Sequence, residues 1–236
     1  MQGAQRQSGG MTGKVLGSFM RKGFFTRKAD TLLGVDINDT AIRLVELGRS
    51  DGGYSIQGYA SQALPARAVV EGALLDLESV GRTLDAILPR LHTATRGAAV
   101  AVAGPSVITR VIEMAAGLSE EEMALLIQAE AEQYIPYPLD EVAIDFHIKG
   151  RSPLDPARVE VLLAACLKEH VETREAVLAL AGLVPKVIDV EAFALARACS
   201  QDFASFTPGH RVDGAQWAVD AQSMGVACGL ALRSFA

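Results

Sequence analysis

The chain has 236 residues, 50% of them hydrophobic and 21% charged, with a formal net charge of −6 at pH 7. This composition is typical of a globular protein with a sizeable core and excludes an intrinsically disordered chain. The acidic balance argues against a nucleic-acid binder, and no apolar run approaches the roughly 18 residues that cross a bilayer. Three scattered cysteines give no disulfide framework and indicate reduced core thiols.

Residues 1–30 form a basic leader, with six Lys or Arg against a single acid, Asp30, and apolar side chains between them. We expect a disordered, solvated segment. The alternative is weak contact of residues 14–28 with an anionic membrane surface, because basic segments with interleaved apolar residues can lie on such a surface.

The pattern of residues 31–104 predicts an α/β layer. Short β-branched runs and alternating patterns, separated by a polar turn and by Gly52-Gly53, indicate an antiparallel meander. Leu77–Leu91 has apolar residues at helical spacing, and Ala98–Ala103 is apolar on both faces, as in a central strand. The predicted strands are 31–37, 41–47, 54–59 and 98–103, with the helix at 77–91.

A second unit follows Gly104-Pro105. Its best-marked element is a helix with Ser119 as N-cap and Glu122 completing a capping box, ended by the prolines at 136 and 138. The acids at 120–122 lie in its first turn, where the helix dipole favours them, and we do not interpret them as a catalytic cluster. Strands are predicted at 107–114, 142–148, 159–166 and 184–190, with helices at 171–180 and 191–199.

The hydrophobic pattern of the sequence changes after Gln201. Residues 203–222 contain Pro and Gly and few periodic apolar positions, which predicts a poorly packed loop. Residues 224–235 return to a small-residue helix. The histidines and cysteines show no metal-ligand spacing, and no nucleophile–base set stands out.

Six stretches in this order resemble the PilM family of type IV pilus assembly proteins. They cover most of residues 24–201 and also 224–235. The stretches are LLGVDINDTAIRLVELGRS, LPARAVVEG, VAVAGPSVITRVIEMAAGLSEEE, EAEQYIPYPLDEVAIDF, VEVLLAACLKEHVETREAVLALAGLVPKVIDVEAFALARA and ACGLALRSF.

The resemblance implies an α/β, actin-like (ribonuclease H-like) first lobe related to FtsA, with an inserted small α+β subdomain of the SHS2 or 1C type. In a full family member, ATP and Mg²⁺ lie between two lobes. Here the second phosphate strand and the adenosine motif are missing, so the second lobe is largely absent while both crossover helices remain. The implied parts are a core at 31–104, the insert at 105–186, a return helix at 187–201, a remnant loop at 202–223 and a C-terminal crossover helix at 224–236.

The stretch GVDINDTAIRLVEL is implied to be the first phosphate hairpin. A hairpin turn can point backbone N–H groups at phosphate oxygens, and an aspartate before it can hold hydrated Mg²⁺. This assigns Asp36 to the metal's water, Asn38, Asp39 and Thr40 to the phosphate turn and Arg43 to charge pairing. Family members usually have Ser where this chain has Asp39, whose charge opposes phosphate binding. The alternative is an ordinary core hairpin.

The resemblance also implies a partner, the cytoplasmic N-terminal peptide of a PilN-like membrane protein, bound between core and insert. The candidate wall residues are Arg110, Ile112, Gln133, Tyr134, Ile135 and Pro136. The alternative is that the apolar ones are core residues, since apolar side chains at helical spacing usually are.

We therefore expect a non-enzymatic cytoplasmic adaptor, peripheral to the inner membrane through its pilus assembly partners. We expect no ATP hydrolysis and at best very weak ATP binding, because a cleft with one wall leaves most of the ligand in water. The alternatives are an actin-like ATPase completed by another chain, an FtsA-like cell-division protein, or a non-functional deletion product whose exposed apolar face aggregates.

Overall fold

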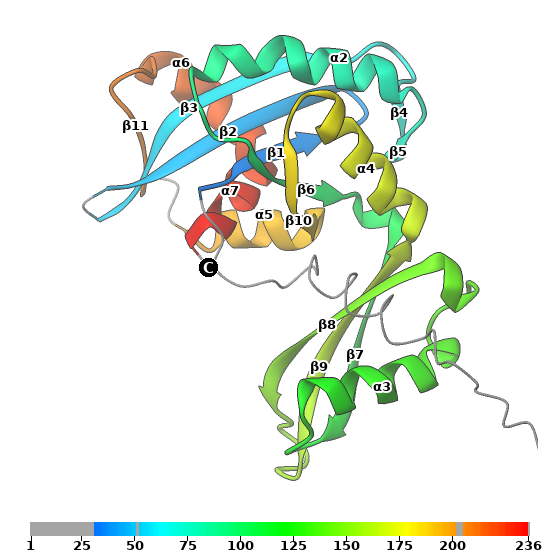
Figure 1. Cartoon of the computed structure of the whole chain (residues 1–236). Coiled ribbons are helices and arrows are strands. Elements are labelled where there is room, and N and C mark those ends of the chain that lie inside the picture. Colours follow the sequence, from blue (N-terminus) through cyan, green and yellow to red (C-terminus); the bar gives the residue numbers. More distant parts are fainter. Residues whose placement is uncertain (1–30, 51, 202–204, 236) are drawn as a thin grey trace, which may run out of the picture.

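The computed structural model describes residues 31–50, 52–201 and 205–235, and the predicted leader, residues 1–30, lies outside this part (Figure 1). Two sheets carry the fold. The strands of the larger sheet are β1 (Leu33–Ile37), β2 (Ala41–Ser50), β3 (Gly53–Ala63), β6 (Gly97–Val102), β10 (Val184–Val190) and β11 (Phe206–Pro208). They are arranged in the order β10-β6-β1-β2-β3-β11.

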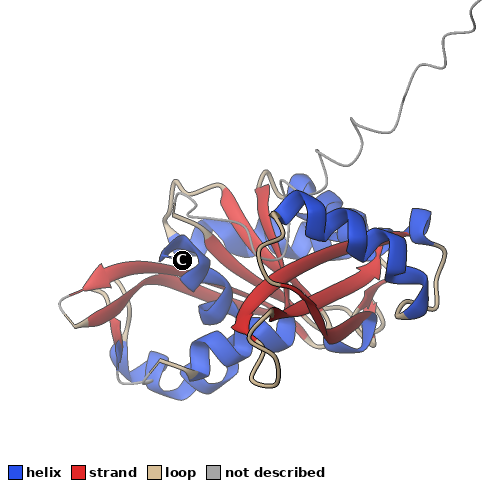
Figure 2. Cartoon of the chain, turned by 90° about the horizontal axis from the view of Figure 1, so that it is seen from below, coloured by secondary structure: helices blue, strands red, loops and turns tan. Residues whose placement is uncertain are grey.

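The larger sheet confirms the predicted meander and central strand. β1, β2 and β3 pair antiparallel, and β6 pairs in parallel with both β1 and β10. Helices lie on both sides of the sheet (Figures 1 and 2). Every residue of β1 is consequently buried, which explains its continuous apolar character.

The helices α2 (Leu77–Ile87) and α4 (Lys168–Leu180) cover one face of this sheet, and α5 (Glu191–Cys199) and α7 (Gly225–Ala231) cover the other (Figure 1). Asp76 begins α2 by accepting a hydrogen bond from the Ser79 backbone N–H at 3.0 Å. The predicted helix at 77–91 stops early at Ile87 and continues as the 3₁₀ turn η2 (Leu88–Leu91), whose Pro89 has no N–H to donate.

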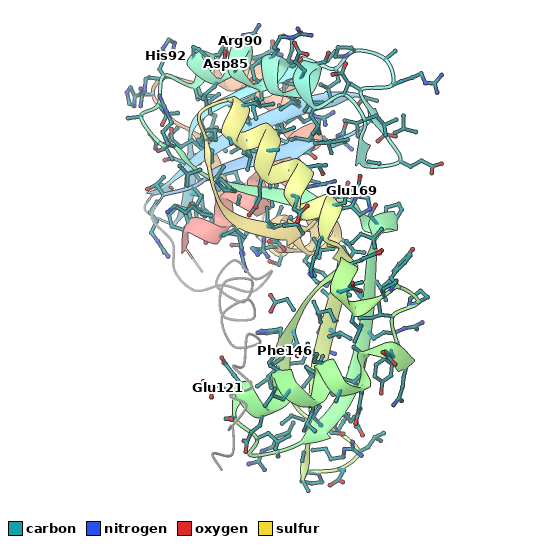
Figure 3. The ribbon with its side chains drawn as sticks, turned by 45° about the vertical axis from the view of Figure 1, so that its right-hand side comes forward. Asp85, Arg90, His92, Glu121, Phe146 and Glu169 are labelled. Carbon is teal, nitrogen blue, oxygen red and sulfur yellow. The ribbon has the colours of Figure 1, made fainter. Side chains whose placement is uncertain are left out.

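The second sheet forms the inserted subdomain. It contains β7 (Val107–Ala115), β8 (Val142–Arg151) and β9 (Arg158–Leu167) in the antiparallel order β7-β9-β8. The helix α3 (Glu120–Glu130) covers one face through Met123 and Ile127, and the Ser119–Glu122 capping box is confirmed. Figure 3 marks the subdomain by Glu121 on α3 and Phe146 on β8, with Glu169 of α4 at its junction with the core.

Helix α4 differs from the prediction in its start and in its packing. It begins at Lys168, directly after β9 and three residues earlier than its periodicity predicts. Although α4 lies within the range assigned to the insert, its Val171, Val177 and Leu178 belong to the core cluster of the larger sheet. The inserted sheet therefore ends at Leu167, and the chain returns to the core before residue 186.

The prediction of a poorly packed loop at 202–223 is wrong for those of its residues that the structure describes. Strand β11 extends the sheet in parallel with β3, and α6 (Gly214–Asp220) follows. Phe206, Trp217 and Met224 are buried in a second core cluster against β2 and β3. The segment has few apolar residues and therefore only a weak periodic pattern. Because those residues include the large side chains Phe206 and Trp217, they still bury enough surface to pack against the sheet.

The remaining short elements complete the chain: β4 (Val69–Val70), β5 (Ala73–Leu74), η3 (Gly104–Ser106), η4 (Ala131–Gln133), η5 (Leu139–Glu141), η7 (Ala221–Met224) and η8 (Leu232–Phe235). The predicted helix at 224–235 is found as α7 and η8. No helix in the described ranges combines the length and the apolar character that crossing a membrane requires.

Candidate functional site

The turn between β1 and β2 was predicted to face a phosphate, but most of its hydrogen-bonding groups are bonded to one another within the turn. The Asn38 side-chain oxygen accepts hydrogen bonds from the Thr40 backbone N–H at 3.0 Å, the Thr40 hydroxyl at 2.9 Å and the Ala41 N–H at 3.1 Å. The Asn38 N–H donates to the Ala41 carbonyl at 3.1 Å. Two of the three backbone N–H groups at 38–40 are therefore already satisfied within the turn.

Asp36, which was predicted to hold Mg²⁺ through water, lies almost fully buried at the end of β1. Its carboxylate accepts hydrogen bonds from Arg43 Nη1 at 3.1 Å and from Asn38 Nδ2 at 3.3 Å. Burial raises the pKa of Asp36 to about 6, and Glu191 adds to the rise, while Arg43 and Asn38 oppose it. Arg43, predicted to pair with phosphate, pairs here with Asp36.

Asp39 reaches across to another element. Its carboxylate accepts the backbone N–H groups of Glu71 at 2.8 Å and Gly72 at 3.0 Å. These two residues form the turn between β4 and β5, far from Asp39 in sequence. From the sequence, the negative charge of Asp39 was expected only to oppose phosphate binding. In the structure, two backbone N–H groups donate hydrogen bonds to that carboxylate.

The turn residues 38–40, together with Asp36, Glu71 and Gly72, line an open pocket of about 370 Å³ at the ends of β1 and β6 and the start of α5. Its acidic lining residues are Asp36, Asp39, Glu71 and Glu191, and none of the described lining residues is Lys or Arg. In the part of the chain that the structure describes, no group of three or more His, Cys, Asp or Glu is arranged to hold a metal ion.

Arg174 is a pocket-supporting residue that the sequence reading missed. Its fully buried guanidinium lies behind the pocket and donates to three backbone carbonyls: Ala101 at 2.6 Å, Gly72 at 2.8 Å and His170 at 2.8 Å. Burial lowers its pKa to about 10. Arg174 lies three residues after Val171, on the apolar stripe of the predicted helix, and this was the available signal.

A second buried polar cluster joins the helices on the other face of the sheet. Asp189, at the end of β10, pairs with Arg197 Nη2 of α5 at 2.9 Å and lies 3.6 Å from Arg233 Nε of η8. Arg197 also donates to the Gly229 carbonyl of α7 at 2.7 Å. This cluster was not predictable from sequence pattern, because its members are far apart in the chain and belong to separate elements.

The predicted partner-binding residues divide into exposed and core positions. Arg110, Gln133 and Pro136 are exposed. Ile135 is 4% exposed and packs in a core cluster, to which Tyr134 is a partly buried neighbour, and Ile112 packs beneath α3. For Ile135 the prediction is wrong, because its side chain fills the insert's own core; Tyr134 and Ile112 contribute to that core in part.

A comparison with protein families shows where the chain belongs. The model of the family described as type IV pilus assembly protein PilM matches residues 34–210. The chain belongs to the PilM family. A solved PilM-PilN type IV pilus biogenesis complex contains a similar chain, with 30% identity over 72% of this chain and a TM-score of 0.64. The match covers 50% of that chain, so this protein spans about half its length.

Two more distant structures also match. One is the cytoplasmic domain of EpsL, an inner membrane component of the type II secretion system of Vibrio cholerae, with 14% identity, 69% and 58% coverage of the two chains and a TM-score of 0.47. The other is the ethanolamine utilization protein EutJ from Carboxydothermus hydrogenoformans, with 15% identity, 80% and 47% coverage and a TM-score of 0.36. The predicted α/β, actin-like first lobe with an inserted α+β subdomain is confirmed for this PilM family member.

Proposed function

We propose that the chain is a PilM-like adaptor in type IV pilus assembly. It binds the N-terminal peptide of a PilN-like protein at the cytoplasmic face of the inner membrane, and it is peripheral to that membrane through its partners. The observation that carries this proposal is the family match over residues 34–210, supported by the 30% identity to a chain of a PilM-PilN complex.

The inserted sheet offers a surface suited to an extended peptide. Among the described strands β7 pairs only with β9, so its outer edge leaves backbone N–H and C=O groups for an added strand. Arg110 and Val111 are exposed on β7, and Gln133 and Pro136 are exposed near its start, where Ile108 and Ile135 share a core cluster. The exposed members of the predicted wall therefore remain candidates for peptide contact.

The proposed adaptor does not hydrolyse ATP and binds it at best very weakly. The lining residues do not fit a nucleotide phosphate chain, because the pocket brings together four acidic residues and the N–H groups of Asn38, Thr40, Glu71 and Gly72 have partners within the protein. Phosphate sites instead present free N–H groups and cations. Asp36, the candidate for holding Mg²⁺ through water, is committed to Arg43.

A binding experiment with an immobilised PilN N-terminal peptide tests the adaptor role. The folded chain is expected to bind it saturably and a scrambled peptide not at all. Arg110→Glu is expected to weaken binding about tenfold or more, because it reverses an exposed charge on the proposed edge. The matched control is Arg151→Glu, an exposed arginine on β8, which is expected to bind as the unaltered protein does.

Absence of binding by the folded chain contradicts the adaptor proposal. ATP-dependent oligomerisation, measured by light scattering after size-exclusion chromatography, favours the second candidate, an ATPase completed by another chain. That candidate has one specific observation in its favour, which is that the chain spans about half of the PilM chain it matches.

A further inference from the structure

The turn between β4 and β5 has the geometry of an anion-binding site. Glu71 and Gly72 both have positive φ, 50° and 78°, as the two-residue turn of a tight hairpin requires. Successive backbone N–H groups in a turn conformation can point to one side and form a concavity that attracts anions. In this structure both N–H groups point at the Asp39 carboxylate.

The turn is held firmly in place. A Cβ at Gly72 would lie 2.2 Å from the Cβ of Ala103, so glycine is required both by its φ and by this close approach. Arg174 donates to the Gly72 carbonyl from the opposite side at 2.8 Å. The two N–H groups therefore keep one direction, and whatever they bind sits in the pocket.

The rest of the pocket offers an entering anion little compensation. Asn38 already accepts the Thr40 N–H, and Arg43 is paired with Asp36. Glu71 and Glu191 add negative charge to the lining. The Asp39 carboxylate thus uses the two fixed donors and repels any anion that approaches them.

We infer that Asp39 is an internal anion that occupies the anion-binding turn of the pocket and thereby excludes the phosphate groups of free ligands. Asp39 is in this sense the specificity-determining residue of the pocket. The inference deepens the proposed weakness of ATP binding, and it is independent of peptide binding by the inserted sheet. Its failure therefore leaves the peptide-binding part of the adaptor proposal untouched.

The test replaces the internal anion by a short neutral acceptor, Asp39→Ser, in the full chain. The matched control is Asp213→Ser, which removes an equal charge from a carboxylate that also accepts two backbone N–H groups, at the start of α6. Binding of Mg·ATP and of inorganic pyrophosphate is measured in parallel by calorimetry. The two probes distinguish a site for nucleotides from a site for free phosphates. Amide NMR signals of Glu71 and Gly72 report on the turn itself.

The unaltered chain and Asp213→Ser are expected to show no saturable binding of either probe at millimolar concentration. Asp39→Ser is expected to bind Mg·ATP, pyrophosphate or both about tenfold more tightly or better. The reason is that a carboxylate beside a bound anion lowers the binding constant of that anion by about tenfold or more. The Glu71 and Gly72 amide signals should shift during that titration. Asp39→Asn keeps an acceptor oxygen at the same reach as the carboxylate, so it is expected to bind more weakly than the shorter Asp39→Ser and serves if the serine variant does not fold.

Two results overturn the inference. Equal binding by the unaltered chain and Asp39→Ser would mean that Asp39 does not compete with phosphate. No binding by any folded Asp39 variant, with the two amide signals unmoved, would mean that the turn is not an anion site.

Discussion

Arg174 gives the sharpest test of how the pocket region is stabilised. The test compares Arg174→Lys with Arg174→Met. The native guanidinium is fully buried and makes three hydrogen bonds to carbonyls of β6, the β4–β5 turn and α4. Lysine keeps the charge but carries a single donor group that cannot match this planar fork, whereas methionine removes the charge and leaves the carbonyls of Gly72 and Ala101 without this donor.

The expected order is that lysine destabilises more than methionine. A buried charge that loses part of its hydrogen bonding costs about 3–5 kcal/mol. Methionine fills most of the volume and removes the desolvation cost, so the remaining loss is that of the unpaired carbonyls, about 1–3 kcal/mol. The two variants thus separate the cost of a buried charge from the cost of lost hydrogen bonds.

Urea unfolding followed by the fluorescence of Trp217 measures these free energies. Trp217 is the single tryptophan, is buried and lies in α6, away from Arg174. A buried lysine has a lowered pKa in the folded state, so the unfolded state binds more protons and the deficit of Arg174→Lys shrinks as pH rises from 7 to 9.5. The deficit of Arg174→Met stays constant. A lysine variant as stable as the unaltered protein, or a pH-independent lysine deficit, refutes the reasoning.

Three further predictions concern other parts of the lobe. Gly229→Ala places a Cβ 1.8 Å from the Ala194 carbonyl oxygen and should lower the free energy of unfolding by about 3 kcal/mol or more, measured by urea unfolding. In the control Gly104→Ala the new Cβ has no atom within 4 Å, so the free energy of unfolding should change by less than about 0.5 kcal/mol. Trp217→Ala should cost about 3–5 kcal/mol by circular dichroism, and Val219→Ala, 76% exposed on the same helix, should be near neutral. The folded-state pKa of Asp36 is about 6 and its ordinary value is 3.8, so the stability from this group is fully present below pH 4 and is lost as pH rises through 6, by up to about 3 kcal/mol. Asp36→Asn should flatten that part of the stability–pH curve, and an unchanged curve would contradict the raised pKa.

The elements with strong local signals were predictable from the sequence. The meander, the central strand at 97–102 and the capped helix α3 each have a periodic pattern or a cap written into neighbouring residues. The bond between Asp39 and the β4–β5 turn joins positions more than thirty residues apart. No local pattern specifies such a contact, because only the pairing of β1, β2 and β6 brings the two turns together.

Buried charge escaped prediction for a different reason. Arg174 and Asp189 lie among apolar residues of a helix and a strand, and a periodicity argument treats a charged residue at such a position as a break in the pattern. Both are satisfied by groups on distant elements: backbone carbonyls for Arg174, and arginines of α5 and η8 for Asp189. Arg197 of the same cluster also donates to the Gly229 carbonyl, so the cluster connects α5 to α7, which lie about thirty residues apart in sequence.

The segment at 205–224 changes how the missing second lobe should be understood. As an unpacked loop it would leave apolar residues of β2 and β3 exposed, as the deletion-product hypothesis requires. Instead β11 pairs with β3, and Trp217 packs edge-on to Tyr59 at 5.0 Å between ring centroids, while the Tyr59 hydroxyl donates to Asp220 at 3.0 Å. Val45, Leu47 and Ile56 beneath this cover are at most 1% exposed. The lobe therefore covers this face with its own residues, and the Trp217→Ala prediction measures how much of its stability depends on that cover.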